Sequence, residues 1–238
     1  MKEQFNLGEI PVEVVFKDIK NIHLSVYPPV GRVRISAPHR MNLDTIRVYA
    51  ISKVDWIKRQ QLKLQGQERE TRREYLSRES HYLWGKRYLL EVIESDTTPG
   101  VDVGHSKLLL KVRPGTGENR KREIVAQFYR DQIKATAPAL IAKWETTMGV
   151  NLAKLHVQQM KTKWGSCNPR TQAIRLNTEL AKKPKHCLEY IVVHELVHFL
   201  EPHHGERFVG FMDTLMPQWR HNKDELNRHP LAHQRWAY

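Results

Sequence analysis

The segment that most constrains this chain runs from His194 to His198, reads HELVH and lies inside an apolar run. Two histidines four residues apart lie one turn apart on the same face of an α-helix. Their imidazoles can therefore reach a single metal ion, at about 2.0–2.1 Å from each nitrogen. The segment predicts a helix that holds a metal ion on one face. Pro184 can open this helix, and we expect it to run to about Glu201.

The residue between the two histidines that matters most chemically is Glu195. The pattern H-E-x-x-H is a known signature of zinc proteases. On a helix Glu195 is rotated by about 100° from the preceding histidine, so it flanks the metal as a general base for the attacking water. Leu188, Val192 and Leu196 make the opposite face apolar, which predicts a buried helix. Burial of two histidines and a glutamate is costly unless they are paired or coordinate an ion.

A third protein ligand is expected, with one position left open for water. Glu201 lies on the same helical face, but three ligands in a row would spread over about 10 Å of helix axis. If the chain reverses direction after the helix, three ligands can converge on one ion, because His203 or His204 then lies over the first two histidines. Spacing alone does not choose between these two. Glu206 and Asp213 also remain possible as ligands or as their hydrogen-bond partners.

The remaining pattern predicts an α+β protein. Short segments rich in Val, Ile and Tyr, separated by turn residues, predict strands, whereas apolar residues at helical spacing predict helices. The expected strands lie at 10–16, 22–28, 32–38, 87–95, 107–115, 154–160 and 173–180, and the expected helices at 43–65, 118–147, 184–201 and 208–216. Pro138 should kink or split the second helix.

Two parts are expected along the chain, with no internal repeat. Residues 1–115 read as a β-rich N-terminal region with one long helix, and residues 116–238 as the catalytic domain. In the second part the metal-holding helix should pack against a small sheet, preceded by a turn-rich connection at 161–171.

Composition and net charge indicate which binding partners and which cellular compartment to expect. Lys and Arg number 39 against 26 Asp and Glu, a net charge of +13, which favours anionic partners such as nucleotides or nucleic acid. Solvation of the surface by basic residues is the simpler interpretation. No stretch approaches the roughly 18 apolar residues of a membrane-spanning helix, and the N-terminus lacks the apolar core of a signal peptide. With only two cysteines, Cys167 and Cys187, we expect a cytoplasmic protein with free thiols.

The chain resembles the YgjP-like metallopeptidases, which are relatives of the SprT-like zinc proteases. The resemblance rests on TKWGSC (162–167), RLNTEL (175–180), VVHELVHFLEPHHGERF (192–208) and MPQW (216–219). Weaker similarity extends upstream, through SVYPPVGRVRISAP (25–38) and VDWI (54–57). It implies a zincin-like catalytic domain, in which an active helix packs on a small sheet.

The resemblance also implies site residues. The family places its third ligand six residues after the second histidine, which selects His204 and puts Phe208 four residues later. His203 departs from the family pattern, which usually has another residue type there. In related zinc proteases a neighbouring strand holds extended substrate, and the resemblance implies this role for the strand expected at 173–180. Gly165 and Ser166 permit a tight backbone path before that strand and are candidate substrate-binding residues, as is Trp164, for which a structural anchor is the simpler interpretation. Tyr190 is a candidate oxyanion donor, and Glu201 a candidate partner of a ligand.

Three functions are compatible with these residues. The leading hypothesis is a cytoplasmic zinc metallopeptidase that acts on peptides or proteins, with other divalent transition metals possible. The second is a metal-dependent nucleoside-triphosphate pyrophosphatase, since an activated water can also attack phosphorus and the net charge of +13 suits a polyanion. Phosphate chemistry usually recruits magnesium through carboxylates, however, and the sequence has no acidic cluster. The third is a DNA-associated protease.

Overall fold

The computed structural model describes residues 2–27, 31–65, 74–160 and 163–228. The chain divides into two compact units, residues 1–68 and residues 69–238. The sequence instead predicted a boundary between residues 115 and 116. The difference arises because the second four-stranded sheet buries Leu90, Leu108 and Leu110 in the same core as the long helix that follows it.

The first unit is a four-stranded sheet followed by two helices. Its elements are β1 (Lys2–Leu7), β2 (Ile10–Lys17), β3 (His23–Tyr27), β4 (Arg32–Pro38), α1 (Leu43–Ser52) and α2 (Val54–Gln65). The strand order is β1-β2-β4-β3, with the central pair β2 and β4 parallel. Alternation along the strands turns Val12, Val14, Val33 and Ile35 into the core. The helix expected at 43–65 is two helices, because the chain turns at Lys53, whose backbone N–H donates to the Ala50 carbonyl.

The second unit begins with a sheet of the same topology. It contains β5 (Ser80–Leu83), β6 (Lys86–Glu94), β7 (Gly100–Val103) and β8 (Lys107–Val112), in the order β5-β6-β8-β7. As in the first sheet, the central pair is parallel and both outer pairs are antiparallel. Each sheet is followed by a helix. The two sheets therefore share one strand topology, although the sequence shows no internal repeat, because many different alternating sequences specify the same strand pairing.

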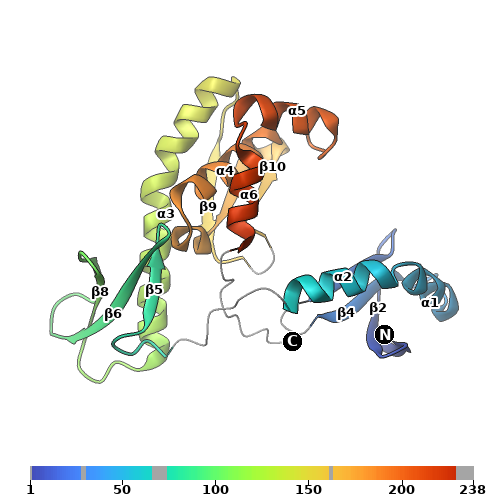
Figure 1. The fold of residues 1–238 in the computed structure, drawn as a ribbon, viewed down its shortest axis with the longest axis horizontal. Helices are drawn as coiled ribbons and strands as arrows, with labels where there is room; N and C mark the ends of the chain where they lie inside the picture. The colour runs from blue at the N-terminus through green and yellow to red at the C-terminus, as the bar shows by residue number, and fades with distance from the viewer. Residues whose placement is uncertain (1, 28–30, 66–73, 161–162, 229–238) are drawn as a thin grey trace. The chain divides into compact units, whose positions relative to one another are not determined.

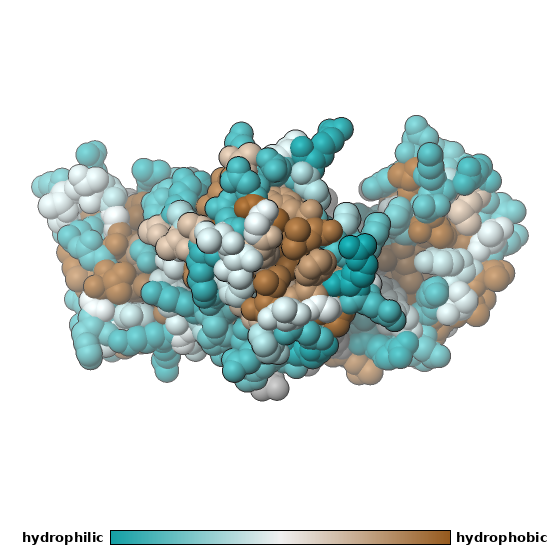
Figure 2. Space-filling view, turned by 90° about the horizontal axis from the view of Figure 1, so that it is seen from above, coloured by the Kyte–Doolittle hydropathy of each residue, from teal (hydrophilic) through white to brown (hydrophobic). Residues whose placement is uncertain are grey.

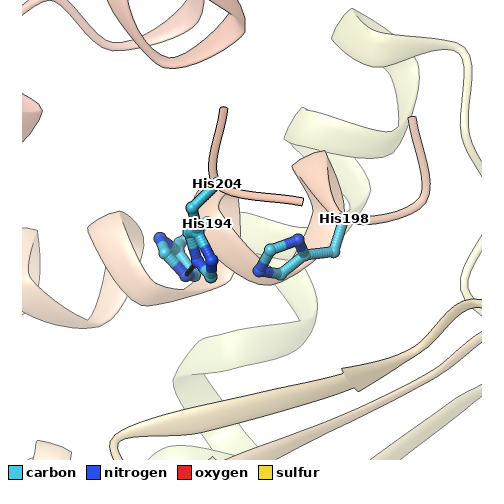
Figure 3. A group of neighbouring side chains, drawn as sticks. All are labelled: His194, His198 and His204. Atoms are coloured by element: carbon cyan, nitrogen blue, oxygen red, sulfur yellow. Dashed lines mark hydrogen bonds between the residues drawn. The ribbon is translucent and has the colours of Figure 1, made fainter. Parts of the chain in front are cut away.

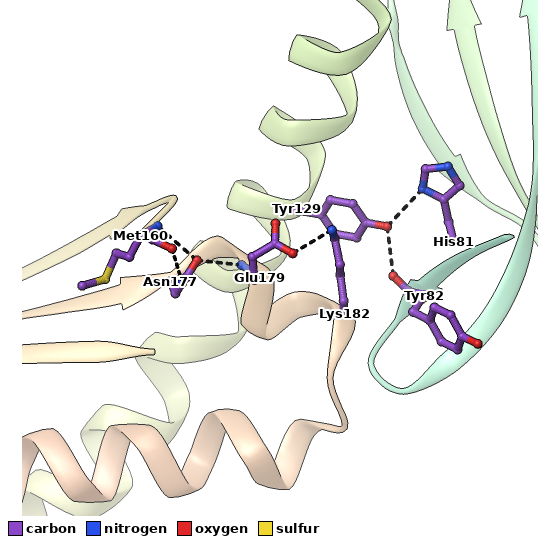
Figure 4. A network of polar contacts seen from close by, with 7 residues as sticks. All are labelled: His81, Tyr82, Tyr129, Met160, Asn177, Glu179 and Lys182. Carbon is purple, nitrogen blue, oxygen red and sulfur yellow. Dashed lines mark hydrogen bonds and ion pairs between the residues drawn. The ribbon is translucent and has the colours of Figure 1, made fainter. Parts of the chain in front are cut away.

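The long helix α3 (Glu118–Met148) joins that sheet to the rest of the unit (Figure 1). It contacts β7 and β8 of that sheet and, in the following part, α4 (Lys185–Val197) and β9 (Lys154–Gln158). Pro138 lies inside α3 and does not split it. The Tyr129 hydroxyl also donates to the Tyr82 carbonyl at 3.0 Å, which ties α3 to the β5–β6 hairpin (Figure 4).

The C-terminal part of the unit combines a three-stranded sheet with three helices. The sheet has the order β10-β11-β9, from β9 (Lys154–Gln158), β10 (Gly165–Asn168) and β11 (Ala173–Asn177). The helices are α4 (Lys185–Val197), α5 (Glu206–Leu215) and α6 (Trp219–Arg228). The sequence predicted neither β10, which it read as a turn-rich connection, nor α6. The strand expected at 173–180 ends at Asn177, and a 3-10 helix, η2 (Thr178–Lys182), continues it.

Asn177 fixes the end of this small sheet. It is 4% exposed, and its side chain makes hydrogen bonds in both directions across the β9–β10 connection (Figure 4). Its Oδ1 accepts from the backbone N–H groups of Met160 and Glu179, and its Nδ2 donates to the carbonyls of Met160 and Lys163. One buried side-chain amide thus forms hydrogen bonds with the backbone on both sides of the connection that leads directly into β10.

The outer surface of the molecule is mostly hydrophilic in the view of Figure 2, with hydrophobic residues between the polar ones. Among the described residues, no helix is both long and apolar enough to span a bilayer.

Candidate active site

Helix α4 carries the H-E-x-x-H pattern and is buried on most of its surface. Leu188, Val192, Val193 and Leu196 are fully buried, as the all-round apolar sequence predicts. The helix ends earlier than expected, at Val197, with His198 as its C-cap. The backbone N–H groups of the next three residues bond back to the carbonyls of Leu196 and Val197, which turns the chain sharply.

That turn brings a third histidine back over the helix. Ligand atoms of His194, His198 and His204 all lie within 4.8 Å of one another (Figure 3). The Nε2 atoms of His194 and His204 are 3.1 Å apart. Two nitrogens that bind one tetrahedral zinc ion lie about 3.4 Å apart, so the three side chains fit such an ion.

Of the other ligand candidates, none joins this cluster among the described residues. The backbone N–H of His203 donates to Glu201 Oε1, so this histidine belongs to the turn. Asp213 is hydrogen-bonded to Arg220 and, at 2.7 Å, to the indole N–H of Trp219. The structure therefore brings together the three histidines that the resemblance implied.

The orientation of His198 is set by the turn. Its Nδ1 lies 3.1 Å from the carbonyl oxygen of Glu201 and donates to it. This hydrogen bond leaves Nε2 as the acceptor atom, the usual arrangement for an imidazole that ligates a metal. The Glu201 side chain points elsewhere, because it accepts from the turn and lies 3.6 Å from Arg207.

Phe208 supports the cluster from α5. It is 3% exposed, and its ring centroid lies 4.7 to 5.0 Å from those of the three histidines. Packing against the Phe208 ring restricts the rotamers of all three imidazoles. The resemblance placed Phe208 at this spacing without indicating its contacts.

Burial favours the neutral form of His194 and His198. The pKa of His194 is lowered to about 3, mainly by burial and further by the charges of His198, His204 and Lys223. Burial also lowers the pKa of His198. The Nδ1 atom of His194 is buried without a hydrogen-bond partner among the described residues. Neutral imidazoles are the form that binds metal ions.

Glu195 lies against the edge strand β10. It is 5% exposed, and burial raises its pKa to about 8, with the charge of Lys163 opposing the shift. Gly165 makes this close approach possible, because a Cβ atom there would lie 2.5 Å from Glu195 Oε1. A carboxyl with a raised pKa beside a metal site is suited to moving protons.

A cavity of about 480 Å³ opens over these groups. Trp164, Gly165, Ser166 and Tyr190, all expected from the sequence, line it, whereas Glu201 does not. The full lining comprises Lys163, Trp164, Gly165, Ser166, Cys167, Pro169, Tyr190, Ile191, His194, Glu195, His198, Pro202, His204, Lys223, Leu226 and Asn227. Sequence reasoning missed Lys163 and the residues from α6, since α6 was not expected. Thr162 of the TKWGSC motif lies outside the described residues.

Two side chains that line the cavity, those of Tyr190 and Cys167, have raised pKa values. The pKa of Tyr190 is raised to about 12 by burial and by the charges of Glu195 and Asp224. Its ring meets the His194 ring edge-on at 5.9 Å. Burial likewise raises the pKa of Cys167 to about 12, so this thiol stays protonated at neutral pH and is a poor metal ligand.

Comparison with known proteins gives one match that covers most of the chain. A family model described as YgjP-like, metallopeptidase domain, matches residues 20–229. The chain is also similar to two solved metallopeptidase zymogens. Abylysin of Pyrococcus abyssi is 16% identical with a TM-score of 0.35, over 40% of this chain and 98% of that one. Jannalysin of Methanocaldococcus jannaschii is 21% identical with a TM-score of 0.34, over 37% and 91%. No curated protein matches the chain.

Proposed function

Because the chain belongs to the YgjP-like metallopeptidase family over residues 20–229, we propose that it is a zinc peptidase whose general base is Glu195. The family match confirms the resemblance carried by the sequence motifs and supports a peptide or protein as substrate. The observation that carries the proposal is the convergence of three histidines beside a buried glutamate, at the floor of an open cavity.

We assign the metal to His194, His198 and His204, and the catalytic fold to the zincin-like type. The chemistry of the donor set supports zinc, since three imidazoles with one open position are a common catalytic zinc site. When bound, zinc lowers the pKa of a water towards about 7 and polarises a carbonyl oxygen. Glu201 and Phe208 would hold the ligands in orientation, the first through its carbonyl and the second through its ring.

Glu195 would accept a proton from the attacking water and deliver it to the leaving amine. Its position on the helix beside His194, outside the cluster of ligand atoms, suits this role. Tyr190 would stabilise the oxyanion of the substrate, because this residue lines the cavity and its raised pKa keeps the hydroxyl protonated at neutral pH.

The edge strand β10 would bind the substrate. β11, which lies within the strand expected at 173–180 to hold substrate, pairs with both β10 and β9 and has no edge left for a peptide. Among the described strands β10 pairs only with β11, so its other edge faces away from the sheet. An extended peptide can add to such an edge through backbone hydrogen bonds. Gly165 and Ser166 line the cavity from this strand, and Trp164 precedes them. We place the protein in the cytoplasm, where its two free cysteines would stay reduced.

The test compares wild type with Glu195→Gln after the metal content of both has been measured. The substitution keeps the three histidines and removes the base. Each protein is given an unfolded protein and, separately, a panel of nucleoside triphosphates. We expect proteolysis that depends on metal and is lost in Glu195→Gln at equal metal content. Cleavage of nucleotides alone would overturn the peptidase proposal, and equal activity of both proteins would overturn the role of Glu195.

A further inference from the structure

The cavity over the histidine cluster is lined by more basic than acidic side chains. Lys163 and Lys223 line it, and Glu195 is the only carboxylate among its described lining residues. Neither lysine forms an ion pair with a carboxylate of the described residues. Asp224 influences Tyr190 through its charge but does not line the cavity. Two lysines and one carboxylate therefore line the cavity.

Lys163 is held beside the proposed base. Its carbonyl oxygen accepts from Asn177 Nδ2 at 2.8 Å, and it precedes Gly165 by two residues. Its charge acts on Glu195, the residue that lies against Gly165. The backbone of Lys163 is thus fixed by a buried amide, while its exposed ammonium group remains available.

Lys223 comes from a different element, the helix α6. Asn222 and Glu225 hold this helix to α4, through contacts with Cys187 Sγ at 3.9 Å and with His186 Nε2 at 2.6 Å. The Lys223 ammonium lies 5.6 Å from the centre of the Trp219 ring, and its charge reaches His194. Its position is therefore set by helix packing, next to the metal ligand.

We propose that this cavity selects substrates with a carboxylate beside the scissile bond, bound by Lys163 and Lys223. The proposal rests on the peptidase function proposed above and specifies its substrate class. The carboxylate can come from an acidic side chain or from the free C-terminus of a peptide. A substrate with a neutral group there would gain no attraction from the two ammonium groups, which lowers its affinity relative to that of an acidic substrate.

The first test profiles cleavage sites in a complex peptide library, using zinc-loaded full-length protein. Wild type is compared with Lys163→Met, Lys223→Met and the double substitution, since methionine keeps most of the side-chain length and removes the charge. Lys134→Met is the matched control, because this exposed lysine lies on α3 and does not line the cavity. Glu195→Gln identifies any cleavage by contaminants.

We expect Asp, Glu or a free C-terminus within two residues of the cleaved bonds, enriched over the library background. Each single substitution should reduce kcat/KM for acidic peptides by up to about fivefold, the upper end of the usual range for an exposed charge pair. Lys134→Met should have no effect. Selectivity should also fall between low and high salt, because the Debye length shrinks from about 30 Å at 0.01 M to about 3 Å at 1 M.

Two further arms separate the sources of the carboxylate. Peptides that differ only by Asp against Asn, each with a free or an amidated C-terminus, show which carboxylate is bound. The same peptides are titrated against zinc-loaded Glu195→Gln, which measures binding without turnover. Tighter binding of the acidic peptide, lost in the lysine variants, is the expected result.

Cleavage that depends on Glu195 but shows no preference for carboxylates would overturn this inference and leave the peptidase function standing. A preference that survives in the double lysine variant would also overturn it. If no peptide is cleaved at all, the peptidase function itself fails, and the inference fails with it.

Discussion

Gly165→Ala tests how closely the edge strand fits the proposed base. The added Cβ would lie 2.5 Å from Glu195 Oε1, 2.9 Å from Glu195 Cγ and 2.8 Å from Ile191 Cγ2. Ordinary contacts begin at about 3.5 Å, so the carboxylate must retreat by roughly 1 Å. A displacement of about 1 Å can cost 100-fold in rate. We therefore expect kcat to fall about 100-fold.

The same substitution should leave metal binding intact, because the three atoms nearest to the added methyl group belong to Glu195 and Ile191 and not to the histidines. Zinc affinity, measured by competition with a chromogenic chelator, should remain at the wild-type level. Gly100→Ala is the control, since Gly100 also lies in a strand and a Cβ there would meet nothing within 4 Å. A Gly165→Ala enzyme with wild-type kcat would refute the argument that the strand positions Glu195. An enzyme that has lost its zinc would show that the damage extends to the metal site.

The other predictions concern the ligands, the base and the loop that leads to β10. His204→Ala should weaken zinc binding by more than about 100-fold, since even changes around a ligand cost up to that much, whereas His203→Ala should bind zinc normally in the same competition assay. In metal-free folded protein the pKa of Glu195 is about 8, against 4.5 for an unperturbed glutamate. Between these pH values the folded state holds a proton that the unfolded state has lost, so the free energy of unfolding falls as the pH rises from 4.5 towards 8. Glu195→Gln should therefore be more stable than wild type at pH 8 and lose this advantage by pH 4.5 in urea unfolding; a constant difference across this range would contradict it. Asn177→Ala should lower the free energy of unfolding by about 4 kcal/mol, because its four side-chain hydrogen bonds are each worth about 1 kcal/mol; a loss below about 1 kcal/mol in urea unfolding would show that water replaces them.

Local sequence was enough to predict the helix that carries the site. The spacing of His194, Glu195 and His198 has meaning only on a helix, and the surrounding apolar residues predict burial of that helix. Periodicity also predicted three strands of the first four-stranded sheet and two of the second, because alternation is a property of each strand by itself. It missed β1, β5 and β7. The repeat of strand order between the sheets escaped detection, since pairing depends on partners that are distant in sequence.

The choice of His204 over His203 needed more than spacing. The resemblance selected it, and in the structure the turn after Val197 directs His204 towards the cluster and leaves His203 outside it. A reversing chain places adjacent side chains on different sides, and the direction of each depends on backbone angles that the sequence does not reveal.

What the sequence by itself determined is the chemistry: two histidines and a glutamate on a buried helix, with free cysteines and an excess of basic residues. Only the tertiary structure decided which other residues line the cavity around these groups. Lys163 and Lys223 lie 60 residues apart in sequence, yet both line one cavity, because β10 and α6 each pack against α4. Periodicity reports which face of an element is buried, whereas the neighbours of that face are chosen by packing over the whole unit.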